Sequence, residues 1–444
     1  MASGPGAQEI PDASRQIRDA VGWAVLALAG LALTALAVRL GARLGTAGAP
    51  FLGRYRVELG PATVLAPIVA AAVLVVAARG LLDRLPWRYV LVWSYVAGLA
   101  WALALAVVDG DGGLTRALSS PDEYPADLAK IDHDPVRFVR YFTTDAADLS
   151  VATRGHPPGP MLLLWMLHKA GVRDQLTLGL LLTALAACTV PLVLSAVRGT
   201  AGEVPARRYL PVLALAPYAI WTAVSLDAVV ALLGAAMVTA GVHASADDRT
   251  GRRAAAWGGV AGLLAGVAAL FSYAAPWLGL SLVLVYFARR RPFLNIASGL
   301  AALVPMLGAA YLLGFSWVTG LRVAHADWTS RVEPHRSVLW WSGISLVALL
   351  LAAGPPLFAS LRKVRNTPAW PFLVGAGCAV LFSVLAGLAR GGVEHAWLPF
   401  FPWLTVAAVA PERQAGPPVP APLLLTALGA LVAVVVEAVL ATPW

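Results

Sequence analysis

The sequence predicts an all-α polytopic membrane protein, and two observations support this prediction. Of the 444 residues, 59% are hydrophobic and only 13% are charged, with a mean hydropathy of +0.74. A soluble domain has about 45–50% apolar and about 25% charged residues. Apolar runs of around 20 residues also recur along the chain, and runs of this length fit a bilayer core about 30 Å thick. The composition excludes a soluble enzyme, a disordered chain and a disulfide scaffold.

The apolar runs predict about thirteen transmembrane helices and one short helix that does not cross. The expected spans are 21–44, 61–80, 87–108, 175–197, 208–223, 226–244, 255–272, 275–288, 293–314, 338–360, 369–389, 396–411 and 420–441. The further run 159–171 has 13 residues, fewer than the roughly 17 that a crossing requires. We expect it to form a re-entrant or tilted helix. Residues 1–20 are expected to be a cytoplasmic tail, and residues 21–444 a single transmembrane domain.

The basic residues predict the orientation in a plasma membrane. With a cytoplasmic N-terminus and a non-crossing 159–171, 18 of the 33 Lys and Arg residues fall in short inner segments. These segments contain Arg15/Arg18, Arg79/Arg84/Arg88, Arg198/Arg207/Arg208, Arg249/Arg252/Arg253, Arg289/Arg290/Arg291, Arg362/Lys363/Arg365 and Arg413. If 159–171 crossed fully, most later clusters would move outside, against the positive-inside rule. The net charge of +9 is therefore a topology signal, and no nucleic-acid partner is expected.

This topology makes residues 109–157 one long outer loop, with a second outer loop at 315–337. The long loop holds nine acidic and five basic residues, a net charge of −4 in a chain of +9. A solvated loop would explain any one of these residues. The concentration of acids, together with most of the histidines, favours a site at the outer face.

Three short motifs are candidates for that site. Asp122-Glu123-Tyr124 follows a proline, where a short helix could begin. Arg154-Gly155-His156-Pro157-Pro158 stands just before the short apolar run, and the prolines fix the angle at which the helix starts. Ser225-Leu226-Asp227 places an acid at an outer helix junction. An incidental histidine in a helix-start signal is the alternative interpretation of the second motif.

The order of these motifs resembles the GT-C membrane glycosyltransferases, most closely the protein O-mannosyltransferase and aminoarabinose transferase branch. Asp122-Glu123 resembles the acidic pair of that branch, and His156-Pro157-Pro158 its His-Pro-Pro-Leu, with Gly159 in place of Leu. Asp227 lies where that branch often has Arg-Pro-Asp. The resemblance covers about residues 87–290. Two spans precede the one that leads into the loop, whereas the family loop usually follows the first span.

Two later stretches resemble actinobacterial members of this class. They are Arg322 to Trp341 and Gly391 to Phe400. These members include the methylthioxylose transferase type, which decorates mycobacterial lipoarabinomannan. The Ala-, Leu- and Arg-rich composition agrees with an actinobacterial source.

The resemblance implies a GT-C-like fold and an inverting transfer of sugar from a polyprenyl-phosphate donor at the outer face. The acceptor implied is an envelope glycan or lipoglycan. Such a reaction needs a carboxylate to accept the acceptor's hydroxyl proton and cations beside the leaving phosphate. We predict Asp122 or Glu123 as the base, with Asp109 as the alternative. Substrate and phosphate binding is assigned to Arg116, Arg154, His156, Asp227, Arg331, Arg336, Glu394 and His395.

No cofactor is expected beyond the lipid-linked donor. Asp122, Glu123, His156 and Glu394 could supply ligands to a divalent metal, but no ligand spacing supports such a site. Membrane lipids are the other expected partners. Two alternatives remain open: a transporter or flippase for a lipid-linked glycan, and a structural subunit of an envelope complex. A transporter would be expected to have ionisable or broken-helix sites near the bilayer midplane, whereas a structural subunit would not need the acidic loop.

Overall fold

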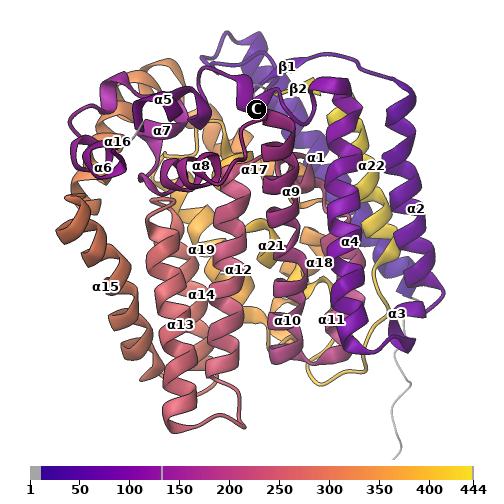
Figure 1. The fold of residues 1–444 in the computed structure, drawn as a ribbon. Coiled ribbons are helices and arrows are strands. Elements are labelled where there is room, and N and C mark those ends of the chain that lie inside the picture. Colours follow the sequence, from indigo (N-terminus) through magenta and orange to yellow (C-terminus); the bar gives the residue numbers. More distant parts are fainter. Residues whose placement is uncertain (1–11, 132–133, 443–444) are drawn as a thin grey trace, which may run out of the picture.

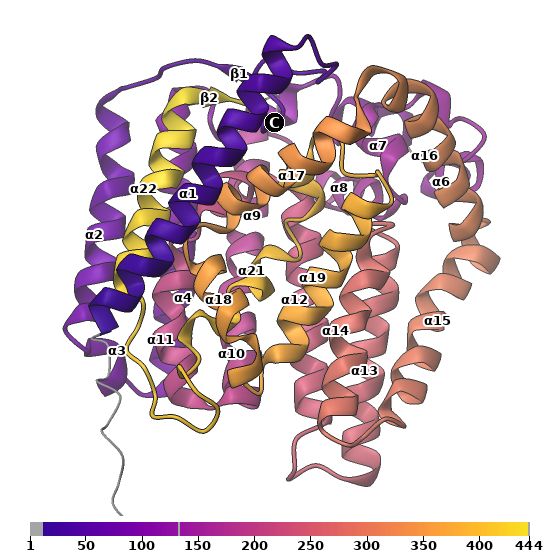
Figure 2. The same cartoon turned by 180° about the vertical axis from the view of Figure 1, so that it is seen from behind.

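The computed structural model describes residues 12–131 and 134–442, and in this part nearly all of the regular secondary structure is helical. Most of the long helices run side by side along one common direction (Figure 1, and from behind in Figure 2). Short helices from the 109–157 segment gather at one end of this bundle, which we call the loop end. The two short strands β1 (Arg54–Tyr55) and β2 (Leu440–Ala441) pair antiparallel.

The bundle is built from helices of different lengths. They are α1 (Asp12–Arg39), α2 (Leu65–Ala78), α4 (Trp87–Ala106), α9 (Gln175–Ala187), α10 (Thr189–Ala201), α11 (Glu203–Ala214), α12 (Leu226–Ala244), α13 (Gly251–Ala269), α14 (Ala275–Ala288), α15 (Leu294–Leu313), α17 (Val338–Ala353), α18 (Pro356–Lys363), α19 (Trp370–Leu385) and α22 (Leu423–Val439). The connecting helices are α3 (Leu81–Arg84), α5 (Leu128–Ile131), α6 (Pro135–Tyr141), α7 (Val151–Gly155), α8 (Gly159–Lys169), α16 (Trp317–Arg331), α20 (Val393–Ala396) and α21 (Phe401–Leu404).

Among the described residues, six helices are long and apolar enough to cross a membrane, or up to seven if one bent pair counts as a span. That pair joins 317–335 to 338–353 at an angle of 98°. This confirms the prediction of an all-α polytopic membrane protein. All thirteen predicted spans fall on helical elements, but several are short or interrupted. The span 338–360, for example, divides into α17 and α18 at Gly354-Pro355.

The first helix differs from the prediction at its start. Helix α1 begins at Asp12, so the second half of the predicted tail 1–20 is helical. Residues 1–11 lie outside the described part of the chain. Asp19, in the second turn of α1, accepts hydrogen bonds from Arg362 at 2.8 and 3.1 Å. The start of α1 is thereby fixed to the end of α18.

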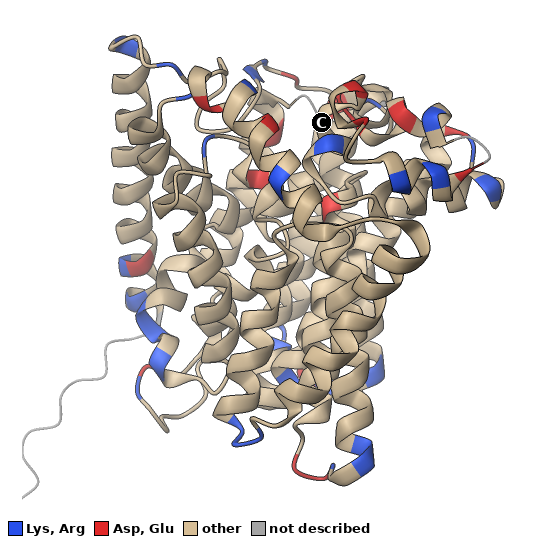
Figure 3. Ribbon diagram, turned by 90° about the vertical axis from the view of Figure 1, so that its left-hand side faces the viewer, with Lys and Arg blue, Asp and Glu red and all other residues tan. Residues whose placement is uncertain are grey.

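The predicted inner basic clusters lie at the same end of the bundle, opposite the loop end. Arg362 also binds Glu412 at 2.5 Å, Arg208 donates to the carbonyl of Val419 at 2.5 Å, and Arg289 donates to that of Val242 at 3.1 Å. Charged residues are concentrated at the two ends, while the middle of the bundle is nearly free of them (Figure 3). We call the end with these clusters the basic end.

The short apolar run 159–171 stays at the loop end, as the distribution of basic residues predicts. It forms α8, of 11 residues. The amide of Gly159 donates to the carbonyl of Leu270 at 2.9 Å. Six residues after α8, at the start of α9, Gln175 accepts a hydrogen bond from Ser119 of the long loop at 2.8 Å. Both ends of α8 therefore lie near the loop, and the helix does not cross the bundle.

We expect a cysteine at Ser119, in a variant without Cys188 and Cys378, to react with a membrane-impermeant maleimide added outside intact cells. Ser119 is exposed in the loop. A cysteine at Asn295, next to the Arg289–Arg291 cluster, should react only after permeabilisation. The reverse pattern would place the loop end in the cytoplasm and would contradict the predicted orientation.

Candidate active site

Hydrogen bonds of Asp122 and Asp127 hold the acidic loop against α7 and the residue before it. Asp127 is buried; its carboxylate accepts hydrogen bonds from Lys130 and from the amide of Ser150, both at 2.7 Å. Burial raises the pKa of Asp127, but these hydrogen bonds outweigh it and hold the pKa below its ordinary value. The carbonyl of Asp122 accepts from the amide of Ala152 at 2.9 Å. The segment 122–127 therefore lies against α7, which ends just before His156.

Asp227 connects two histidines that are distant in sequence. Its Oδ1 lies 3.5 Å from Nε2 of His156, and its Oδ2 lies 3.2 Å from Nδ1 of His395. His156 Nδ1 is 2.9 Å from the carbonyl of Ala152. Because both partners of the His156 ring accept hydrogen bonds, both ring nitrogens donate when the two contacts are satisfied together. This arrangement favours the imidazolium form of His156.

The electrostatics agree with that geometry. Burial lowers the pKa of His156, but the hydrogen bond and negative charge of Asp227 outweigh it, so the pKa lies above the ordinary value. The carboxylate of Glu123 is the next acidic neighbour of this ring. The surroundings of His156 therefore favour its protonated form, on the side of the bundle where the acidic loop packs.

Local structure fixes the orientation of Asp227. Ser225 is the N-cap of α12, and its hydroxyl accepts from the amide of Asp227 at 3.2 Å. Just before it, Val224 has a φ of 62°, a left-handed conformation that a β-branched residue rarely adopts. Its amide donates to the hydroxyl of Thr183 at 3.0 Å. Such strain persists only when the surroundings hold it, and it is typical of functional sites.

A glycine turn presents His395 to Asp227. Gly391 and Gly392 have φ values of 92° and 72°, which are accessible to glycine at little cost. Helix α20 then begins at Val393, and His395 lies in its single turn. The turn brings a residue of the last third of the chain to the start of α12.

Glu123 is the loop carboxylate nearest this cluster in electrostatic terms. Burial raises its pKa; the charge of His395 lowers it, that of Asp227 raises it and that of His156 lowers it again, so that the pKa lies above its ordinary value overall. Asp122, the other member of the predicted pair, has an exposed side chain. Of the predicted pair, Glu123 therefore interacts with the cluster, whereas Asp122 is in solvent.

Tyr124 packs beside His156. Its ring centroid lies 5.7 Å from that of His156, with the planes tilted by 54°. Its side chain is buried in a cluster with Leu118, Met161 and Leu226. Burial raises the pKa of Tyr124 well above its ordinary value. Tyr124 is therefore a neutral wall beside His156.

Two predicted residues lie apart from the cluster. Asp109, at the end of α4, binds Arg56 at 3.0 Å and Arg116 at 2.5 Å. Arg56 also pairs with Glu58. The alternative base is thus held between two arginines, one of which, Arg56, was not among the predicted site residues.

The other predicted arginines, Arg154, Arg331 and Arg336, bind other groups of the protein. Arg154, with 13% of its side chain exposed, donates to Asp327 at 2.9 Å, and Asp327 also accepts from Arg331 at 2.8 Å. Arg336 donates to the carbonyl of Arg390 at 2.8 Å. Asp327 was not predicted and connects α7 to α16.

Glu394 is fully buried and fixes the segment after α1. Its Oε1 accepts from the amide of Leu52 at 2.9 Å, and its Oε2 has no hydrogen-bond partner in the described part of the chain. Burial raises the pKa of Glu394. Backbone hydrogen bonds and the charges of His395 and Arg336 offset part of that increase. Its partner lies on a segment other than α12, so Glu394 supports the turn that carries His395.

The glycine that departs from the His-Pro-Pro-Leu pattern has a steric reason. A Cβ atom at Gly159 would lie 2.3 Å from the carbonyl oxygen of Leu270 and 2.7 Å from Cδ2 of Phe271. The first turn of α8 therefore packs directly on the turn between α13 and α14. Only glycine permits this approach.

We expect Gly159→Ala to destabilise the protein by about 1–3 kcal/mol, because the added methyl group must displace backbone. The same displacement should weaken the Gly159–Leu270 hydrogen bond and move His156. Thermal unfolding in detergent measures the first effect. Gly155→Ala is the matched control, since nothing lies within 4 Å of a Cβ there. Equal unfolding temperatures for the two variants would contradict the close packing.

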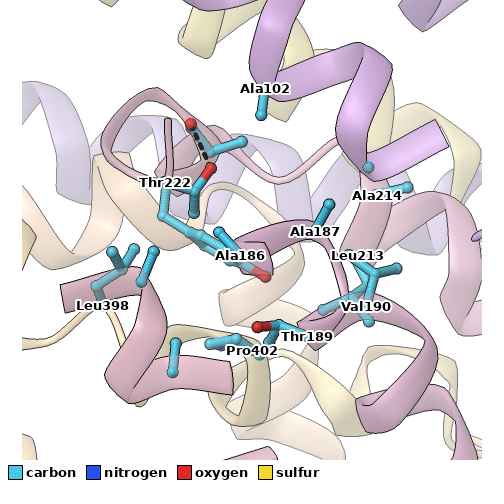
Figure 4. A pocket seen from close by; sticks show the side chains of 15 residues that line it. Ala102, Ala186, Ala187, Thr189, Val190, Leu213, Ala214, Thr222, Leu398 and Pro402 are labelled. Atoms are coloured by element: carbon cyan, nitrogen blue, oxygen red, sulfur yellow. Dashed lines mark hydrogen bonds between the residues drawn. The ribbon is translucent and has the colours of Figure 1, made fainter. Parts of the chain in front are cut away.

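Two cavities of the described structure differ in size and position. One, of about 40 Å³, is lined mainly by alanines of α4, α9 and α12, with Thr189 and Thr222 among its polar residues (Figure 4). That volume suits a few water molecules. The other, of about 320 Å³, is near Arg208 and Asn366 at the basic end. The larger space is thus at the end opposite the histidine cluster.

Among the described residues, no group of three or more His, Cys, Asp or Glu side chains is arranged to hold a metal ion. The two histidines share one carboxylate, which contacts one nitrogen of each ring. The cluster is therefore suited to anion binding and proton transfer. Sequence reasoning found its members separately but did not predict that Asp227 joins them.

Comparison with protein-family models gives no match, and neither does comparison with curated proteins. Among solved structures, the chain is similar to ArnT from Cupriavidus metallidurans bound to undecaprenyl phosphate, with 18% identity, a TM-score of 0.47 and 70% of this chain covered. The apo state of the same protein gives 18% identity, a TM-score of 0.43 and 62% coverage. This chain spans 59% and 54% of those two chains. The site assignments rest on the geometry of this chain.

Proposed function

We propose that this chain is an inverting GT-C glycosyltransferase that moves a sugar from a polyprenyl-phosphate donor to an envelope glycan or lipoglycan. The reaction takes place at the loop end, on the outer face of the plasma membrane. The observation that carries the proposal is the cluster of Glu123, His156, Asp227 and His395 under the acidic loop. It combines a carboxylate of raised pKa with cationic donors, which are the two elements that glycosyl transfer from a phosphate requires.

In this mechanism Glu123 is the base. The acceptor oxygen attacks the anomeric carbon, its proton passes to the Glu123 carboxylate, and the bond from that carbon to the phosphate oxygen breaks. The leaving phosphate keeps the bonding electron pair and gains one negative charge. The positive charge of the His156 imidazolium stabilises it, while Asp227 holds the rings of His156 and His395 in place. Attack from the face opposite the phosphate inverts the anomeric configuration.

The charges of the cluster suit this transfer. The imidazolium form of His156 balances the negative charge of Asp227. The proton that reaches Glu123 removes one negative charge as the phosphate gains one, so the total charge of the site is unchanged. A buried site, where charge separation is expensive, benefits from such a balance. The proposed reaction uses no metal or organic cofactor.

The position of the charged groups favours transfer over transport. A flippase would be expected to keep ionisable groups near the bilayer midplane. Here the histidines and Glu123 are at the loop end, and the charged residues are concentrated at the two ends (Figure 3). ArnT, one structure of which is bound to undecaprenyl phosphate, binds a lipid of the class that we propose as donor carrier. The proposal itself rests on the residues of this chain.

The test is reconstitution of the purified chain in liposomes with radiolabelled undecaprenyl-phosphate pentoses and hexoses and an extracted envelope lipoglycan. We expect label to move to the lipoglycan with release of undecaprenyl phosphate. Movement of the intact lipid-linked sugar across the bilayer without transfer would contradict the proposal and support the flippase alternative.

The pH dependence of transfer should be bell-shaped. Glu123 must be ionised to accept a proton, and its raised pKa places the acidic limb above the ordinary glutamate value of about 4.3. His156 must be protonated, and its raised pKa places the alkaline limb above the ordinary histidine value of about 6.5. Initial rates at saturating donor measure both limbs. They should be recorded between pH 4 and pH 10, at intervals of roughly half a pH unit. An alkaline limb below that of ordinary histidine would contradict the role of His156.

A further inference from the structure

Helices α6 and α16 form an exposed basic surface beside the candidate site. Arg137 and Arg140 on α6 and Arg322 on α16 are all exposed; we call these three residues the arginine rim. The end of α6 packs on the turn that leads from α15 into α16. A Cβ atom at Gly314 would lie 3.2 Å from Cγ of Arg140, and Phe142 packs edge to face on Phe315 with ring centroids 5.9 Å apart. Figure 1 shows α6 and α16 together at the loop end.

The arginine rim lies where a membrane-facing helix ends. Only three residues of α15 are buried, and it exposes large apolar side chains along its length, among them Ile296 at 67%, Leu300 at 64% and Tyr311 at 83%. Such a surface suits lipid tails. The rim follows directly on the last turn of α15, so it is at the height of lipid headgroups.

A chain of charged contacts continues from this surface to the site. On α16, Asp327 accepts from Arg331 and, on its inner side, from Arg154 of α7. Arg154 is two residues before His156, the cation that the proposed mechanism places on the phosphate. Basic side chains are thus available from the outer rim to the site, with Asp327 keeping the two inner arginines from repelling one another.

From this arrangement we propose that the α6–α16 surface is the lateral entrance through which the anionic polyprenyl-phosphate donor passes from the leaflet to His156. The inference rests on the proposed function. The occupant is a lipid because the rim adjoins the apolar face of α15, and it is anionic because the rim presents three exposed arginines. Exposed charges of one sign raise the local concentration and the association rate of an oppositely charged ligand.

The test is the triple variant Arg137→Gln/Arg140→Gln/Arg322→Gln, in full-length protein in phosphatidylcholine nanodiscs. We expect kcat/KM for the donor to fall about fivefold to tenfold at low salt, with kcat at saturating donor unchanged. The loss should shrink as ionic strength rises, since salt screens exposed charges. The matched control is Arg252→Gln/Arg253→Gln/Arg290→Gln at the basic end, which removes the same charge from exposed positions and should leave kcat/KM at the wild-type value.

A second measurement separates this proposal from the proposed function. The association rate of a fluorescent undecaprenyl phosphate does not depend on turnover, and it should fall in the rim variant and not in the control. Slower association without any sugar transfer by wild type would support the entrance and contradict the transferase. An association rate equal to that of wild type would overturn the entrance. If only retention of added phosphatidylglycerol fell, the rim would be a general headgroup contact and the proposal would be wrong.

Discussion

Glu123→Gln is expected to lower kcat for sugar transfer about 10²–10⁴-fold, the usual contribution of proton abstraction by a positioned base. Glutamine keeps the shape of the side chain and removes its basicity. The acidic limb of the pH profile should disappear with it, because that limb reports ionisation of Glu123. Single-turnover transfer with saturating donor measures the effect without interference from product release.

Two carboxylates provide the controls for this experiment. Asp122 is adjacent in sequence but has an exposed side chain, so Asp122→Asn should retain most of the activity. Asp109 is held by Arg56 and Arg116, and Asp109→Asn should act mainly on stability. If Glu123→Gln stays active and Asp109→Asn is inactive while folded, the base is at the end of α4 and our assignment is wrong.

The second large effect is expected for Asp227→Asn, which should lower kcat/KM for the donor roughly 10²–10³-fold, the cost of removing a preorganised electrostatic contact. The amide cannot accept from both histidines as a carboxylate does. His156 then loses the negative charge that raises its pKa, and the alkaline limb of the rate profile should move to lower pH. A pH series on the purified variant measures both changes.

Asp247→Asn is the matched control, because Asp247 is exposed just beyond the other end of α12. It should leave the profile unchanged. If Asp227→Glu, which keeps the negative charge, retains the activity that Asp227→Asn loses, the charge is the cause. An alkaline limb that stays in place in Asp227→Asn would show that Asp227 does not support the imidazolium of His156.

The sequence was sufficient for the class of protein because hydrophobicity is a local property, and each predicted span is an apolar run. It predicted thirteen spans, whereas six or seven helices of the described residues are long and apolar enough to cross. The breaks at Cys188, before Pro191, and at Gly354-Pro355 were not predicted, although proline is a local signal for a helix break. The contact between Asp19 and Arg362 could not be predicted, because these residues are 343 positions apart.

The site was predictable only in its separate motifs. Glu123, His156 and Asp227 each stand in a recognisable local pattern, but no pattern encodes the contact of Asp227 with His395, 168 residues later. Asp327 and Arg56 were not predicted for the same reason, since each acts through a distant partner. Glu394 was predicted to bind substrate because it is next to a histidine in sequence. In the structure its side chain is buried and accepts a hydrogen bond from the amide of Leu52.

The most direct test of the transferase centre is a cryo-EM structure of the full chain in nanodiscs with undecaprenyl phosphate. We expect density for the phosphate next to the imidazole rings of His156 and His395, with the lipid tail leaving past α16 towards α15. A phosphate bound instead between Arg56 and Arg116 beside Asp109 would contradict our assignment and place the active site at the end of α4.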